Sequence, residues 1–333
     1  MKQTTRRVAG WILRLAVLAL IGWWLSRGDT WSQLTAALDR LPLANLLGAL
    51  GCGLVISTFA GVRWRLVMNA FGAEPRPPVH LLVRGYVVGQ FYNLFVPGGI
   101  GGEVVRGVIT RKYFGTVGTG VMVAFLDRII GLGSLMAVFT VGLLLGPDLP
   151  HLEEYGVYLY AVGGVATALV VCTVLAGYFR RRLEGLPVIG ALIRLGSRLV
   201  ARVEDRFDQK LHLSALATPW PLVAAFALSA AMHGMAISVF ALIGAGLDLG
   251  LDAATLLAIV PLAIIASMLP IAVAGLGPRE AALVVMLGPL GVAQGEALAL
   301  SLCYWAVLIF IAAMGGLVQL VWGVDLPHAG EAG

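Results

Sequence analysis

Long apolar segments are the feature of this sequence that most limits its fold. An α-helix needs about 20 apolar residues to cross about 30 Å of hydrocarbon, and lipid offers no hydrogen-bond partners to an open backbone. Only 12% of the 333 residues are charged, about half the share found in soluble domains. The sequence therefore predicts an all-α integral membrane protein, a single polytopic domain over 1–333 with about six full transmembrane helices, at 8–26, 44–70, 117–145, 156–179, 218–245 and 297–322.

The charges and the cysteines exclude several kinds of function. The formal net charge is +5, but the basic residues lie in short stretches between apolar segments, which is typical of cytoplasmic loops rather than of a nucleic-acid-binding surface. The three cysteines, Cys52, Cys172 and Cys303, each lie alone in an apolar run and lack the spacing of metal ligands. We expect no metal, no cofactor and no nucleic-acid partner.

Two further apolar regions, 79–112 and 254–291, are interrupted. The first contains Phe95-Val-Pro-Gly-Gly-Ile-Gly-Gly-Glu-Val-Val-Arg106, and the second contains Met268-Leu-Pro-Ile-Ala-Val-Ala-Gly-Leu-Gly-Pro-Arg-Glu280. Proline and glycine break helices, and broken backbone at membrane depth survives only where protein or a water-filled cavity covers it. Both regions are predicted to be re-entrant or broken-helix hairpins that face the protein interior.

The placement of lysine and arginine predicts the orientation in a cell (inner) membrane. Basic residues at the N-terminus and in the amphipathic linker 180–212 place both in the cytoplasm. The loops 146–155 and 246–253 carry acidic residues but no Lys or Arg, so they are expected outside. The C-terminus then returns to the cytoplasm.

The interrupted regions occupy corresponding places in two halves, 1–179 and 213–333. The predicted orientation makes the two regions enter the membrane from opposite faces. Inverted-repeat transporters are built in this way, with the binding site near the bilayer midplane. An inverted repeat is therefore expected, although the halves share little sequence.

Charges deep in apolar segments are candidate site residues, because a charge at the bilayer centre costs about 2.5–3.5 kcal/mol on insertion scales and is usually kept for a cavity or a partner. Arg279 is the only Lys or Arg after Lys210, and we expect it to bind substrate or to act in gating. Its neighbour Glu280 points about 100° away on a helix, so each is expected to have a different partner.

The first interrupted region offers a second set of charges. Glu103 and Arg106 share a helix face, so they pair either with each other or with Arg279 and Glu280 across the two halves. Glycines at a helix start let backbone N–H groups form an anion-binding nest, and arginine suits phosphate. The glycines expected at such a site are Gly98, Gly99, Gly101, Gly102, Gly275 and Gly277.

Three more polar residues belong to the candidate substrate-binding set. Asp127 and Arg128 are adjacent in one apolar segment and face different directions, so one of them is placed to meet a partner on a hairpin. Asn93, just before the first break, either lines a cavity or satisfies the broken backbone.

These motifs occur in a recognisable order: Gly89-Gln-Phe-Tyr-Asn93, Pro97-Gly-Gly-Ile-Gly-Gly-Glu103 with Arg106, Asp127-Arg128, and Gly275-Leu-Gly-Pro-Arg-Glu280. The set resembles the lysylphosphatidylglycerol synthase transmembrane-region family, also called the flippase-like family, over nearly the whole chain. The resemblance implies movement of a lipid with a polar headgroup across the membrane. Fused relatives carry a soluble aminoacyl-transfer domain that this sequence lacks, so lysyl transfer is not expected.

The leading hypothesis is a flippase for a phospholipid, an aminoacyl-phospholipid or a polyprenyl-phosphate-linked sugar. Arg106 and Arg279 would hold the phosphate, while Glu103, Glu280 and Asp127 would balance those charges or bind a cationic headgroup or proton. Two other hypotheses stay open: an intramembrane enzyme acting on a lipid phosphate, and a membrane partner of a separate synthase or glycosyltransferase. No nucleotide-binding, serine-hydrolase or metalloprotease motif occurs in the sequence, so an enzyme is disfavoured.

Overall fold

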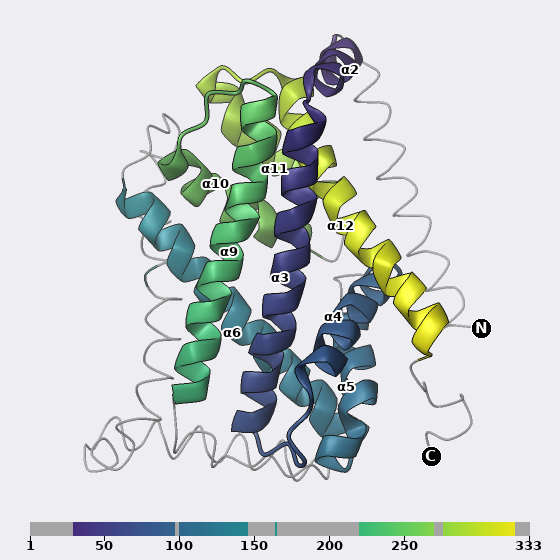
Figure 1. Ribbon diagram of the computed structural model, residues 1–333. Coiled ribbons are helices and arrows are strands. Elements are labelled where there is room, and N and C mark those ends of the chain that lie inside the picture. The colour runs from purple at the N-terminus through teal and green to yellow at the C-terminus, as the bar shows by residue number, and fades with distance from the viewer. Residues whose placement is uncertain (1–28, 97–99, 146–163, 165–219, 270–275, 324–333) are drawn as a thin grey trace, which may run out of the picture.

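The computed structural model describes residues 29–96, 100–145, 164, 220–269 and 276–323 (Figure 1). Regular structure in these ranges is helical, as expected for an all-α membrane protein. Three predicted segments lie outside the described residues: the helices at 8–26 and 156–179 and the basic linker 180–212.

Within the described ranges, four long apolar helices form the main body of the bundle. Each has 27 to 29 residues, which at 1.5 Å per residue gives about 40 Å, enough to cross a bilayer. The four predicted segments that fall in the described ranges are thereby confirmed as helices long and apolar enough to span. They are α3 (Leu43–Ala70), α6 (Val117–Leu144), α9 (Trp220–Gly246) and α12 (Gln294–Trp322).

Both interrupted regions are pairs of short helices separated by a break. The first pair is α4 (Val79–Asn93) and α5 (Gly101–Phe114), and the second is α10 (Ala253–Ser267) and α11 (Pro278–Leu287), which continues into the 3-10 turn η3 (Gly288–Leu290). Within each pair the two helices pack against each other. The predicted breaks at the Pro- and Gly-rich motifs are therefore confirmed.

The described helices repeat one order, long, short, short and long, in α3–α6 and again in α9–α12. The contacts between the two sets correspond as well. The first short helix of each set packs on the last long helix of the other, α4 on α12 and α10 on α6, and the first long helices, α3 and α9, lie along each other. In Figure 1 the α4–α5 pair lies toward the lower end of the long helices and the α10–α11 pair toward the upper end. The two pairs of short helices therefore lie toward opposite ends of the four long helices.

One further helix, α2 (Thr30–Arg40), is short and amphipathic. Its Thr30, Leu34 and Ala37 are buried, and it packs against α12. Trp31 on the other face is 61% exposed. The helix therefore covers the start of α12 and presents an apolar side chain outward.

Candidate functional site

Asp127 of α6 holds two arginines in the interior. Its carboxylate is fully buried and accepts two parallel hydrogen bonds from Arg63 of α3, Nε to Oδ1 at 2.9 Å and Nη2 to Oδ2 at 2.8 Å. Arg106 of α5 donates from Nη1 to the same Oδ2 at 3.0 Å. Arg63 also donates from Nη1 to the Ser229 hydroxyl of α9 at 3.0 Å. The bidentate pairing fixes the guanidinium group of Arg63, and Arg106 is tied to the same carboxylate by one hydrogen bond.

Glu103 in the first turn of α5 extends the network through one oxygen only. Its Oε1 accepts from Arg106 Nη2 at 3.3 Å and from Arg128 Nη1 at 3.1 Å. Its Oε2 is buried and has no hydrogen-bond partner among the residues that the structure describes. We call Arg63, Glu103, Arg106, Asp127 and Arg128 the polar cluster. Three guanidinium groups and two carboxylates give it a formal charge of +1.

Aromatic rings support the central arginine of this cluster. The Cζ of Arg106 lies 5.2 Å from the centre of the Trp64 ring and 5.8 Å from that of Tyr86. Both distances are within the range of cation–π attraction. Arg106 is therefore held by two carboxylates and two aromatic rings.

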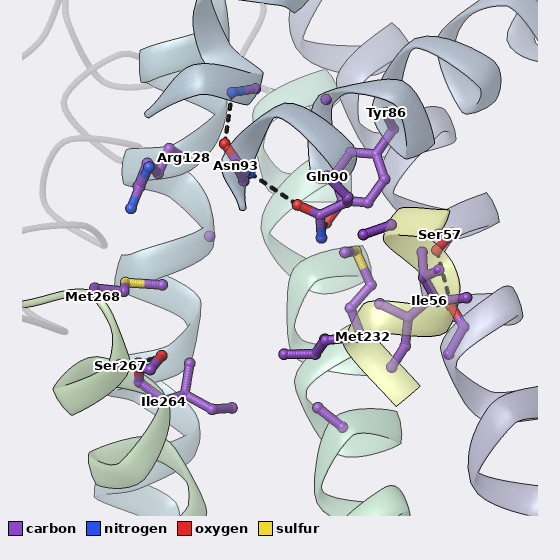
Figure 2. Close-up of a pocket in the computed structure, with 18 of the residues that line it drawn as sticks. Ile56, Ser57, Tyr86, Gln90, Asn93, Arg128, Met232, Ile264, Ser267 and Met268 are labelled. Carbon is purple, nitrogen blue, oxygen red and sulfur yellow. Dashed lines mark hydrogen bonds between the residues drawn. The ribbon is translucent and has the colours of Figure 1, made fainter. Parts of the chain in front are cut away.

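Asn93 fixes how α5 begins after the break. Its Oδ1 accepts the backbone N–H of Gly102 at 2.5 Å, and its Nδ2 donates to Gln90 Oε1 at 2.9 Å (Figure 2). A Cβ on Gly102 would lie 2.8 Å from Asn93 Oδ1 and from the Gly89 carbonyl oxygen, so only glycine allows this approach. Asn93 thus satisfies the broken backbone, and one N–H of the expected anion nest already has a partner.

The polar cluster opens onto a cavity of about 350 Å³ lined by residues of α3, α4, α5, α6, α9, α10 and α12. Four charged residues of the cluster, Arg63, Glu103, Arg106 and Arg128, line it together with Gln90 and Asn93. Figure 2 shows Gln90, Asn93 and Arg128 at one end, with Met232, Ile264 and Met268 further along the cavity. The cavity therefore joins a cationic, hydrogen-bonding end to apolar walls.

Arg279 and Glu280, at the start of α11, form a separate buried group. Arg279 Nη2 donates to Glu280 Oε1 at 2.7 Å, and the Ser301 hydroxyl of α12 donates to the same oxygen at 2.7 Å. Glu280 Oε2 accepts the N–H of Gly277, whose φ of +107° suits glycine. Arg279 is 1% exposed, and one of its nitrogens, Nη1, has no partner in the described part of the chain.

The expectation that Arg279 and Glu280 have different partners is wrong. The 100° angle applies to the Cα–Cβ directions, whereas these long side chains bend toward each other in the first turn of α11. Pairing across the two halves is also not found: among the described residues Glu103 pairs with Arg106 and Arg128. Neither Arg279 nor Glu280 lines the cavity, but Tyr304 does, and its ring lies 5.2 Å from Arg279 Cζ.

Other expected site residues are placed as follows. The expectation for Asp127 and Arg128 was that one of them would meet a partner on the first interrupted region, and both do, through Arg106 and Glu103 of α5. Gly101 and Gly102 lie in the first turn of α5, and Gly277 lies just before α11. Gly98, Gly99 and Gly275 are outside the described residues.

Sequence reasoning missed Arg63, Ser229 and Ser301. Arg63 was not among the candidate site residues, and it lies about two turns before the end of α3. Its position inside the apolar segment 44–70 was the signal that could have identified it. The two serines gave no signal, because a hydroxyl in a membrane helix often bonds its own backbone.

Comparison with known proteins gives one match. A family model described as "Lysylphosphatidylglycerol synthase TM region" matches residues 11–316. No curated protein and no solved structure matches the chain. The matched range includes both halves, the polar cluster and the Arg279–Glu280 pair.

Proposed function

Because the chain belongs to the lysylphosphatidylglycerol synthase TM region family, we propose that this membrane-embedded helical protein is a flippase for a phosphate-containing lipid. The phosphate would enter the cavity at the polar cluster, and the hydrocarbon tails would remain in the bilayer. Phospholipids, aminoacyl-phospholipids and polyprenyl-phosphate-linked sugars all carry the required group.

One observation carries this proposal: three arginines and one carboxylate line the polar end of the cavity, and apolar side chains line the rest. Charged groups are costly inside a membrane and are usually kept there for function. A lipid phosphate diester has one negative charge, which these arginines would attract. Arginine is also the side chain best suited to hold phosphate oxygens in pairs.

The residues of the polar cluster would have different roles in binding the phosphate. Arg128 is the most exposed of its three arginines, with 19% of its side chain accessible, so we assign it and Arg106 the phosphate contacts. Asp127 and Arg63 would position Arg106. Arg279 and Glu280 would contact the substrate only at another stage of transport, because Tyr304, and not they, lines the cavity.

The inverted arrangement of the helix pairs supports alternating access. In this mechanism the two short-helix pairs would act as re-entrant hairpins, and rocking of one half against the other would expose the cavity to each side in turn. The protein would lie in the cell (inner) membrane with both termini in the cytoplasm. A separate synthase or glycosyltransferase that makes the lipid is the proposed protein partner.

The test is lipid movement by purified protein in liposomes. Fluorescent phospholipid is scored by dithionite quenching, and a short-chain polyprenyl-phosphate sugar by lectin binding at the far leaflet. Arg128→Gln should lose most of the movement. Arg40→Gln is the matched control, because Arg40 forms a surface ion pair with Glu296 and its side chain is 56% exposed. Equal rates for Arg128→Gln and wild type would remove the proposed phosphate contact.

A second candidate function, an intramembrane enzyme that acts on a lipid phosphate, is favoured by one feature. Glu103 lines the cavity, and its Oε2 has no hydrogen-bond partner among the residues described in the structure; a carboxylate there could serve as a general base. Mass spectrometry of lipids from the same vesicles distinguishes the two. A new lipid species that appears without movement between leaflets would favour the enzyme.

A further inference from the structure

We infer that Glu103 is a proton-binding site that couples lipid movement to the proton gradient, and this inference rests on the proposed flippase function. Glu103 is 4% exposed and lines the cavity. Only one of its oxygens is engaged, and both bonds to it come from arginines. The other oxygen, Oε2, has no partner in the described ranges and is free to take a proton.

The hydrogen bonds of the neighbouring groups make Glu103 the residue best placed to bind the proton. Both oxygens of Asp127 accept hydrogen bonds from arginines, so a proton there would displace a donor. His233 Nε2 lies 2.9 Å from the Gly131 carbonyl oxygen, which fixes its ring. The titratable or charged side chains around the cavity, element by element, are Arg63 of α3, Tyr86 of α4, Arg106 of α5, Asp127 and Arg128 of α6, His233 of α9 and Tyr304 of α12.

Charge balance gives the coupling. The empty polar cluster has a formal charge of +1. Protonation of Glu103 raises it to +2 and weakens the hold of Glu103 on Arg106 and Arg128, which then accept a phosphate diester and return the total to +1. The cluster therefore has the same charge when it is empty with Glu103 deprotonated and when it holds lipid with Glu103 protonated. The other two states, lipid without the proton and the proton without lipid, have a different charge and are disfavoured in a low-dielectric interior.

The protonated carboxyl also supplies a donor. A carboxylate at this position repels a phosphate oxygen, whereas a neutral carboxylic acid donates a hydrogen bond to it. The proton is taken from water on the more acidic side and released on the other side, when the lipid leaves and Glu103 again pairs with the arginines. One proton and one monoanionic lipid cross together, so the step moves no net charge.

The experiment uses the full chain in liposomes with a trace of fluorescent phosphatidylglycerol. A pH difference is imposed across the membrane, and the electrical potential is held at zero with valinomycin and equal potassium. With one proton for each lipid, the wild-type protein should enrich the probe in the leaflet that faces the more alkaline side, about tenfold for each unit of pH difference. Glu296→Gln, which changes a surface carboxylate, should behave like wild type.

Glu103→Gln should move the probe in exchange experiments but distribute it evenly despite the pH difference, because glutamine imitates the protonated side chain permanently. Glu103→Asp keeps a titratable group and should keep the enrichment at a lower rate, which decides the assignment where the glutamine variant fails to fold. Even distribution by a wild-type protein that moves the probe would overturn the inference and leave the flippase function standing. Enrichment retained by Glu103→Gln would overturn the assignment, and no movement at all would contradict the flippase itself.

Discussion

Asp127 is fully buried and pairs with two arginines at once. Arg63 and Arg106 approach it from α3 and α5 at 2.8 to 3.0 Å. The carboxylate therefore joins three helices of the first half at one point. Its first role is structural, since it sets the positions of the guanidinium groups that line the cavity.

Asp127→Asn should lower the free energy of unfolding by about 3–5 kcal/mol, because it leaves two buried arginines without their common counter-charge. Glu296→Gln is the control, since Glu296 pairs with the largely exposed Arg40 and such surface pairs contribute about 0–1 kcal/mol. Thermal unfolding of both variants in detergent measures the difference. Equal melting temperatures for the two would show that the buried pairing does not stabilise the fold.

Much of the residue-level site was predictable. A charged residue in an apolar segment can be recognised from the sequence alone. Glu103, Arg106, Asp127 and Arg128 were predicted in this way, and in the structure they form ion pairs with one another. The pairing of Arg279 with Glu280 was not predictable from helical angles, because those angles describe the backbone and not a flexible guanidinium group. Packing decides such pairs.

At the scale of elements, glycine determines how closely the helices of the two halves approach. Gly142 lies where α6 crosses α10, and a Cβ there would be 2.6 Å from the carbonyl oxygen of Leu257. Gly315 has the same role where α12 crosses α4, with Val87 and Val88 against it. Small residues at such crossings are usual in membrane helices.

Gly142→Ala should destabilise the protein by about 1–3 kcal/mol, because backbone must shift to admit the methyl group. Gly51→Ala is the matched control within α3, where an added Cβ meets nothing within 4 Å, and alanine is the better helix former by about 1 kcal/mol. Chemical or thermal unfolding in the same detergent gives both values. A loss of stability at Gly51 as large as at Gly142 would contradict the role of the crossing.

The start of α10 has a pH-dependent cap. The Asp252 carboxylate accepts from the Thr255 backbone N–H at 2.6 Å, and hydrogen bonds from the side chain and the backbone of Thr255 lower the pKa of Asp252. Because the folded-state pKa is the lower one, the stabilisation is present above the unfolded pKa and is lost as the pH falls through the folded value. Asp252→Ala should cost about 1 kcal/mol at neutral pH and less in acid. A difference from wild type that does not change between neutral and acidic unfolding experiments would exclude the cap.

The sequence predicted the broken helices well and the amphipathic α2 not at all. Proline and glycine interrupt α4–α5 and α10–α11 for local reasons that the sequence shows directly. The helix α2, by contrast, has 11 residues, too few to register as a span, and its position is set by packing on α12. The sequence around a short helix does not predict it when its position depends on packing against a segment far away in the chain.

At the scale of the whole molecule, the order of long and short helices reveals a repeat that residue identities hide. The polar cluster belongs to the first half, while the described residues at the equivalent break of the second half hold the Arg279–Glu280 pair. The halves thus share an architecture and differ in charge. Neither this asymmetry nor the cavity could be derived from the sequence, because both depend on which helices meet.

The last prediction concerns how the two breaks lie in the membrane. Phe95 and Leu269 are each the second residue after the first helix of a pair, and they are 60% and 46% exposed. Arg76 and Ala253 are exposed residues near the starts of α4 and α10. With single cysteines in a cysteine-free protein, re-entrant pairs from opposite faces predict that Arg76→Cys and Ala253→Cys react with an impermeant maleimide from opposite sides. Phe95→Cys and Leu269→Cys, at the breaks, should react more slowly than both, because the breaks of re-entrant pairs end at membrane depth.

Fast labelling of Phe95→Cys or Leu269→Cys from the side opposite to the start of its helix pair would show instead that this pair crosses the membrane. Alternating access would then need a different pair of moving elements.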